Sequence, residues 1–149
     1  MYNLFDSNNA TAILYRIEQL KPDSQRKWGR MDVAKMMAHC SAALEMSMSQ
    51  KKFPRSFMGF VFGKMARPTF SGPQPFKQNL PTDKRFLVAN TESFEIEKAK
   101  LIRLIKKFSE GKEKALSPFA HPFFGKLRPE EWAAGMHKHL DHHLQQFGV

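Results

Sequence analysis

Histidine is the residue type in this sequence whose spacing is best suited to chemistry. Six histidines occur among 149 residues, and four of them lie in the run MHKHLDHH at 136–143. Histidine ring nitrogens bind divalent metal ions and exchange protons near neutral pH. His139 and His143 are four positions apart, so on a helix their side chains lie one turn apart. This spacing allows both imidazoles to bind a single ion.

Helical geometry divides the C-terminal histidines into two groups. At about 100° per residue, His139 and His143 share one arc with the apolar residues of the segment, while His137 and His142 lie on its flanks or beyond. The apolar residues of this arc are Trp132, Met136, Leu140 and Phe147. Two neutral imidazoles on an apolar stripe need polar partners. This requirement favours a ligand that both of them share.

A third ligand is expected from His39, the other histidine that falls on a predicted helix. It borders the apolar stripe of that helix, next to Met36 and Ala43. An alternative stays open, in which His39 bonds a backbone carbonyl and the C-terminal cluster is a polar helix end. Under the metal hypothesis, one divalent ion is held by His39, His139 and His143. Imidazole suits several transition metals, among which we favour zinc or nickel.

Four amphipathic helices are predicted to position these side chains. They cover about 9–20, 32–49, 92–110 and the segment from Pro129 nearly to the C terminus. Ser7 or Asn8 is expected to cap the first helix and Asp32 the second. Gly111 is expected to cap the end of the third. A strand signal occurs at 86–88, and one isolated strand cannot form a sheet. The predicted fold is therefore all-α, a four-helix bundle.

A long connection rich in Pro, Gly and Phe separates the second and third of these helices. It covers 53–81, and a short helix near 56–66 is predicted within it. Asp and Glu are absent from 46–82, where six Lys and Arg alternate with phenylalanines, as in single-strand nucleic-acid binders. The helical spacing of several phenylalanines favours packing against the bundle instead, and nucleic acid is not the preferred partner. The same basic surface suits an anionic small-molecule substrate.

Size and composition favour a single domain over residues 1–149. Hydrophobic residues make up 42% and charged residues 26%, an ordinary globular balance, and the formal charge is +10. No apolar run approaches the roughly 20 residues of a membrane helix, so no membrane partner is expected. The N terminus lacks a signal-peptide pattern, and a lone cysteine, Cys40, fits a reducing compartment. We predict a cytoplasmic protein, for which a homodimer is one option.

Two runs carry the histidines of interest: WGRMDVAKMMAH, which ends at His39, and HLDHHLQQFG, which begins at His139. Together with NLFD near the N terminus, NLPT at 79–82 and HPFFGKLRPEEW at 121–132, they resemble the DinB/YfiT-like superfamily of metal-dependent enzymes. Within that superfamily, the chain is most similar to a bacterial subfamily of unassigned function. The resemblance covers nearly the whole chain.

The DinB-like resemblance implies a four-helix bundle with one metal-binding histidine on the second helix and an HxxxH pair on the last. In this chain the matching positions are His39, His139 and His143. Some members of the superfamily use low-molecular-weight thiols in transfer or isomerisation, so a small thiol is an expected cosubstrate. The Arg-Gly-Gln that often follows the last motif is replaced here by Leu-Gln-Gln at 144–146. No role of that arginine therefore transfers.

Three neutral imidazoles leave an open position on a bound ion, as in catalytic zinc sites. Water or a thiol bound there becomes a nucleophile at neutral pH. We therefore expect a metal-dependent transferase or hydrolase, with no catalytic side chain assigned and a cavity lined by Met36, Ala43 and Trp132. The alternatives are a non-catalytic metal-binding scaffold and a nucleic-acid-binding module formed by 46–82.

Other polar and cysteine residues are less favoured as parts of the metal site. Asp141 and Glu45 are candidates to orient the ligating imidazoles, although a solvated helix position is the favoured interpretation of each. Cys40 lies on an apolar stripe and is favoured as a small buried hydrophobe. His121 precedes a proline in a loop that either covers the site or is simply exposed.

Overall fold

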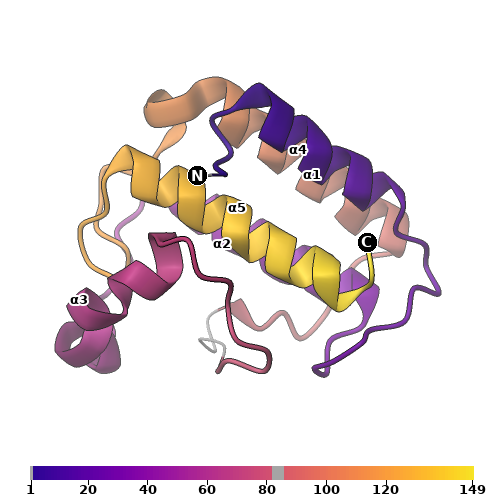
Figure 1. Ribbon diagram of the computed structural model, residues 1–149, viewed down its shortest axis with the longest axis horizontal. Helices are drawn as coiled ribbons and strands as arrows, with labels where there is room; N and C mark the ends of the chain where they lie inside the picture. Colours follow the sequence, from indigo (N-terminus) through magenta and orange to yellow (C-terminus); the bar gives the residue numbers. More distant parts are fainter. Residues whose placement is uncertain (1, 82–85) are drawn as a thin grey trace.

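The computed structural model describes residues 2–81 and 86–149, which are helical or irregular throughout (Figure 1). Its helices are α1 (Ser7–Glu18), α2 (Val33–Ser47), α3 (Phe57–Ser71), α4 (Phe94–Gly111), the 3-10 helix η2 (Lys112–Ala115) and α5 (Pro129–Gln146). Over the described residues no β-strand forms, and His121 and Gly125 make an isolated bridge. The all-α prediction is confirmed. Thr82, at the end of the acid-free segment and of NLPT, lies outside the described residues.

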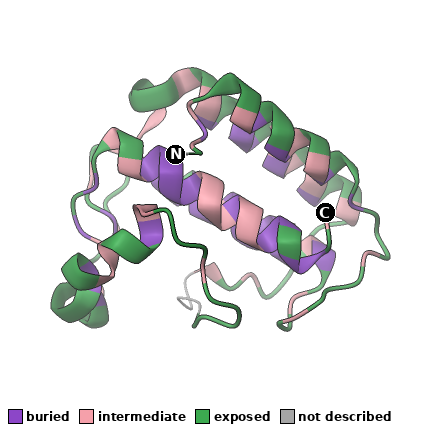
Figure 2. Cartoon of the chain, viewed as in Figure 1, coloured by how far each residue is buried: buried purple, intermediate pink, exposed green. Residues whose placement is uncertain are grey.

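Helices α1, α2, α4 and α5 enclose the apolar core. Helix α4 contacts both α1 and α2, and α5 contacts the same two helices (Figure 1). The buried residues lie on the faces that these helices turn toward one another (Figure 2). Fully buried side chains from all four helices include Ile13, Met37, Leu101, Phe108 and Leu140. Their removal from water is the main favourable contribution to folding.

Aspartate side chains cap the first turns of α1 and α2, and the cap of α1 differs from the prediction. Asp6 caps α1, because it has an extended backbone and its carboxylate accepts the backbone N–H of Asn9 at 3.0 Å. The two residues predicted for this role are already inside the helix. Asp32 caps α2 as predicted, accepting the N–H of Lys35 at 2.8 Å. Gly111 is the last residue of α4 rather than its cap.

Helix α3 occupies the segment predicted mainly as a connection. It runs to Ser71, beyond the predicted end near residue 66, and includes Pro68. Gly59 and Gly63 are buried where α3 crosses the loop before α5, and a Cβ atom at Gly63 would lie 1.9 Å from the carbonyl oxygen of Phe123. Glycine therefore permits the close approach of this helix. No helix of the described chain is long and apolar enough to cross a bilayer.

Candidate metal centre

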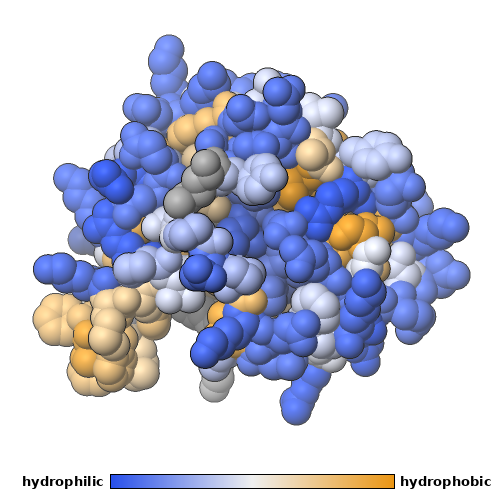
Figure 3. Space-filling model, in the orientation of Figure 1, coloured by the Kyte–Doolittle hydropathy of each residue, from blue (hydrophilic) through white to orange (hydrophobic). Residues whose placement is uncertain are grey.

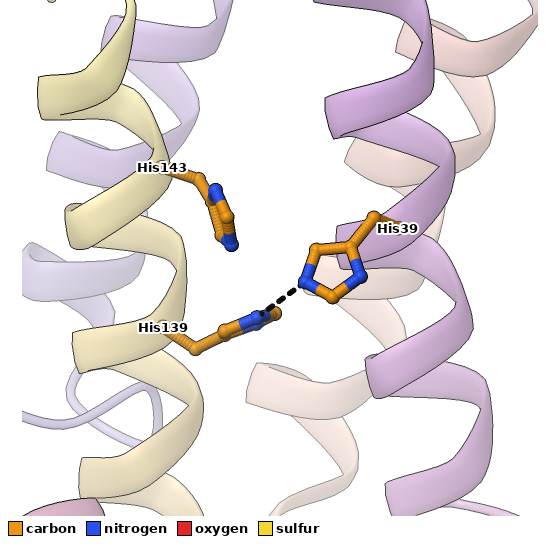
Figure 4. A group of neighbouring side chains, drawn as sticks. All are labelled: His39, His139 and His143. Carbon is orange, nitrogen blue, oxygen red and sulfur yellow. Dashed lines mark hydrogen bonds between the residues drawn. The ribbon is translucent and has the colours of Figure 1, made fainter. Parts of the chain in front are cut away.

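The three histidines singled out in the sequence come together between α2 and α5 (Figure 4). Helix α2 contributes His39, and α5 contributes His139 and His143 from successive turns on the side that contacts α2. One nitrogen from each imidazole lies within 4.8 Å of the other two. Three histidines that are up to 104 residues apart in sequence are therefore close enough to bind one metal ion.

The arrangement of the rings fits a single ion. Each pair of ring centroids is separated by 4.8 Å, so His39, His139 and His143 form a regular triangle. The Nε2 atoms of His39 and His139 are 2.9 Å apart. Tetrahedral zinc with Zn–N bonds of about 2.0–2.1 Å requires nitrogen separations of roughly 3.4 Å. One separation is 2.9 Å and none exceeds 4.8 Å, so small side-chain adjustments suffice for binding.

Hydrogen bonds on the far side of two rings orient them toward the centre. Nδ1 of His39 lies 3.0 Å from the carbonyl oxygen of Phe86, and Nδ1 of His143 lies 2.9 Å from Oε1 of Gln146. Both partners only accept, so each Nδ1 carries the proton and each Nε2 presents its electron pair toward the centre, where that of His39 accepts the Nε2–H of His139 at 2.9 Å. The Gln146 amide is itself fixed, because its nitrogen donates to the carbonyl of Trp28 at 2.7 Å.

The three imidazoles are neutral at pH 7. Burial lowers the pKa of His143 to about 3, and burial also lowers the pKa of His39 and of His139. Mutual repulsion of the imidazolium forms lowers the His139 pKa further. A histidine with a depressed pKa is unprotonated above that value, which is the state that binds metal. Protons therefore compete with a metal ion only below the ordinary histidine pKa of about 6.5.

His121 lies outside this group and organises the loop before α5. It is buried, and its Nδ1 accepts the backbone N–H groups of Phe123 and Phe124 at 3.0 and 3.2 Å. Its ring centroid lies 5.3 Å from that of Trp132. These contacts and a ring contact with Phe70 of α3 place His121 between α3 and the start of α5 rather than among the three ligands.

The carboxylates considered as partners of the ligands are engaged elsewhere. Asp141 forms an ion pair with Arg16 at 2.6 Å, which joins α5 to α1. Glu45 pairs with Lys100 at 3.0 Å, which joins α2 to α4. Each is therefore a surface residue in an interhelical ion pair, the interpretation that the sequence favoured.

The buried residues near the ligands on the same helices form part of the core. Cys40 is fully buried with its thiol 3.8 Å from the sulfur of Met36, and burial strongly raises the pKa of that thiol. It behaves as a small hydrophobe, as predicted. Met36, Ala43 and Trp132 are buried as well. Trp132 lies seven residues before His139, about 10 Å along the helix, where it packs in the core and lines a separate cavity.

The partners that orient the ligands were not found from the sequence. Gln146 follows His143 by three positions, which places it on the same side of α5 one turn later, so its spacing was a usable signal. Phe86 contributes a backbone carbonyl, a group that every residue carries. Sequence alone contains no signal for that contact.

The fold and the site define an all-helical protein with three histidines placed to bind one metal ion. The chain belongs to DUF1569, a family of proteins of unknown function, whose model matches residues 4–148. No curated protein and no solved structure matches the chain. The family description names no activity.

Replacing Gln146 with leucine is expected to weaken metal binding by about 10–100-fold, the usual effect of losing a group that orients a ligand. The change removes the acceptor for the Nδ1–H of His143 and frees that ring to rotate. Competition with a chromogenic chelator measures the affinity. The matched control is Gln145→Leu, since Gln145 is exposed and donates to Asp141 instead. Equal losses in the two variants would contradict the assigned role of Gln146.

Proposed function

We propose that the protein is a metal-dependent enzyme of the DinB-like type, with a zinc or nickel ion held by His39, His139 and His143. The observation that supports this proposal is the convergence of three neutral imidazoles, two of which are fixed through their outer nitrogens. Structural zinc sites are closed by four protein ligands, whereas catalytic sites have three and an open position. When bound, the ion would lower the pKa of a water or thiol at that position toward neutrality.

The chain's own groups supply the geometry that this chemistry needs. Phe86 and Gln146 hold two of the imidazoles in place. His139 is half-buried and His39 and His143 are 5% and 8% exposed, so the group is largely enclosed by the helices. In the proposed transfer, the sulfur of a small thiol bonds to an electrophilic carbon. The leaving group departs with its electron pair, and the thiol proton passes to solvent.

The arrangement of helices supports the DinB-like part of the proposal. Helices α1, α2, α4 and α5 pack as a closed set, with the ligands on the second and the last of them. The resemblance found in the sequence implies this distribution of ligands. The formal charge of +10 and the acid-free segment favour a small anionic substrate.

The proposed activity is tested with a panel of small thiols and electrophiles, assayed with metal-loaded protein, metal-stripped protein and His139→Ala. We expect turnover by the loaded protein, a loss of at least about a hundredfold in the other two samples, and recovery of stripped wild type on adding the ion. His137→Ala serves as the control, because His137 stacks on Tyr2 away from the centre.

Two outcomes would decide against this function. Turnover that survives both stripping and His139→Ala would contradict metal catalysis. No turnover across the panel by protein that retains its ion would instead favour a non-catalytic metal-binding scaffold.

A further inference from the structure

Helix α3 has all but one of its large apolar side chains on the outside. Six of them are exposed to solvent: Phe57 (79%), Met58 (55%), Phe60 (73%), Val61 (51%), Phe62 (41%) and Met65 (75%). The residues that α3 buries against the rest of the molecule are Gly59, Gly63 and Phe70. An ordinary surface helix buries its large apolar residues and exposes polar ones. The outer face of α3 is therefore built to be covered by another apolar surface.

The exposed side chains form one projecting patch. Figure 1 shows α3 extending away from the other helices, and among the described helices it contacts α5 alone. The apolar residues of α3 form a continuous cluster in the space-filling view (Figure 3). Six such side chains expose on the order of 600 Å². Patches of this size mark interaction sites, and this one is convex rather than a groove.

Positive charge surrounds the apolar patch. The exposed cations on and just before α3 are Lys51, Lys52, Arg55 and Lys64, and no acidic residue occurs in 46–82. The Arg55 guanidinium lies 5.7 Å from the ring centroid of Phe60 and donates to the carbonyl of Gly59. Charge is thus held directly beside the apolar side chains. A surface that complements α3 must combine an apolar interior with negative charge at its boundary.

We propose that α3 is a peripheral membrane-binding helix that inserts its apolar side chains into the interface of an anionic lipid bilayer. Acyl chains would receive residues such as Phe57 and Met65, and anionic headgroups would pair with the surrounding lysines and arginine. The sequence predicted no membrane partner, on the ground that no apolar run is long enough to cross a bilayer, and the proposal departs from that prediction. Attachment to the surface of a bilayer needs only one apolar helical face.

Other occupants fit the patch less well. A second copy of the chain, docked through the same helix, would bring two cationic rims together. Nucleic acid would neutralise the lysines, but the aliphatic residues Met58, Val61 and Met65 offer no ring on which a base stacks. An anionic lipid surface complements both the exposed apolar area and the positive charge of α3.

Vesicle flotation with the full chain tests the membrane proposal. We expect binding to phosphatidylcholine vesicles that contain phosphatidylglycerol, weaker binding to phosphatidylcholine alone, and weakening by salt. Phe57→Ser/Phe60→Ser is expected to reduce the partition coefficient at least tenfold. Lys51→Glu/Lys52→Glu should reduce it by at least about 25-fold, because each basic residue contributes about fivefold.

Matched controls lie on α4, on the exposed surface of a different helix. Ile96→Ser removes a residue that is 53% exposed, and Lys106→Glu/Lys107→Glu reverses two exposed charges. Both controls should bind vesicles nearly as well as the wild type. Circular dichroism of every variant verifies the fold.

Several results would overturn the membrane proposal. One is the absence of binding to the anionic vesicles, and another is an equal loss of vesicle binding in the α3 variants and their α4 controls. A dimer seen by analytical ultracentrifugation that Phe57→Ser/Phe60→Ser dissociates would assign the patch to a second copy. Tighter, salt-dependent binding of single-stranded DNA than of anionic vesicles would assign it to nucleic acid.

Discussion

Alanine at position 39, 139 or 143 is expected to remove the metal ion from the protein. Wild type purified without a histidine tag should carry close to one divalent ion per chain, and each of the variants His39→Ala, His139→Ala and His143→Ala should carry almost none. Losing one of three ligands leaves two imidazoles, so affinity should fall by more than the 10–100-fold typical of an orienting partner. Elemental analysis gives the stoichiometry, and chelator competition gives the affinity.

His137→Ala is the control for the ligand variants. His137 lies on the same helix and within two residues of His139, but its ring stacks on Tyr2 at 5.5 Å between centroids. Its replacement should leave the metal content near one ion per chain. Metal loss from this variant equal to that of the ligand variants would mean that the C-terminal histidines bind metal as an unstructured cluster.

Removing the metal ion is expected to lower the free energy of unfolding by about 4 kcal/mol when free metal was present at a thousand times its dissociation constant. The physical reason is that the ligands come from α2 and α5, so only the folded chain presents all three together. Denaturant unfolding with and without a chelator, at fixed pH and protein concentration, measures the difference.

His143→Ala provides the control for this stability effect. The variant should unfold at the same denaturant concentration with and without the chelator, because it no longer binds the ion. A chelator effect of equal size in wild type and His143→Ala would show that the stabilisation comes from another site. No effect in wild type with a loaded site would show that the unfolded chain binds the ion as tightly.

The helices that carry the ligands were predictable because their signals are local. Apolar residues at helical spacing mark α2 and α5, and Asp32 and Pro129 mark their first turns. Placing His139 and His143 one turn apart on the apolar face of α5 needs only the helical repeat. Their selection over His137 and His142 therefore required no knowledge of the tertiary structure.

Helix α3 shows where local signals mislead. Its glycines and Pro68 predict an interrupted connection rather than a continuous helix. In the structure these residues lie within α3, and Gly59 and Gly63 are needed there because the backbone of Phe123 lies directly against them. The spacing of its phenylalanines predicted packing against the bundle, but several face solvent. A helical repeat specifies which residues share a face, and only the neighbouring elements decide whether that face is covered.

Sequence therefore determined the helical class of the chain and the pairing of His139 with His143, because both depend on periodicity within single helices. His39 was added as the other histidine on a predicted helix and through the DinB-like resemblance, and the tertiary structure brought it to the pair. The tertiary structure decided the distance between α2 and α5 and the partners that orient the ligands. It also decided which apolar face remains open. Phe86 and Trp28 contribute backbone carbonyls from loops far from α5 in sequence, and such groups are identical at every residue. These carbonyls acquire their role only when the fold brings them next to His39 and Gln146.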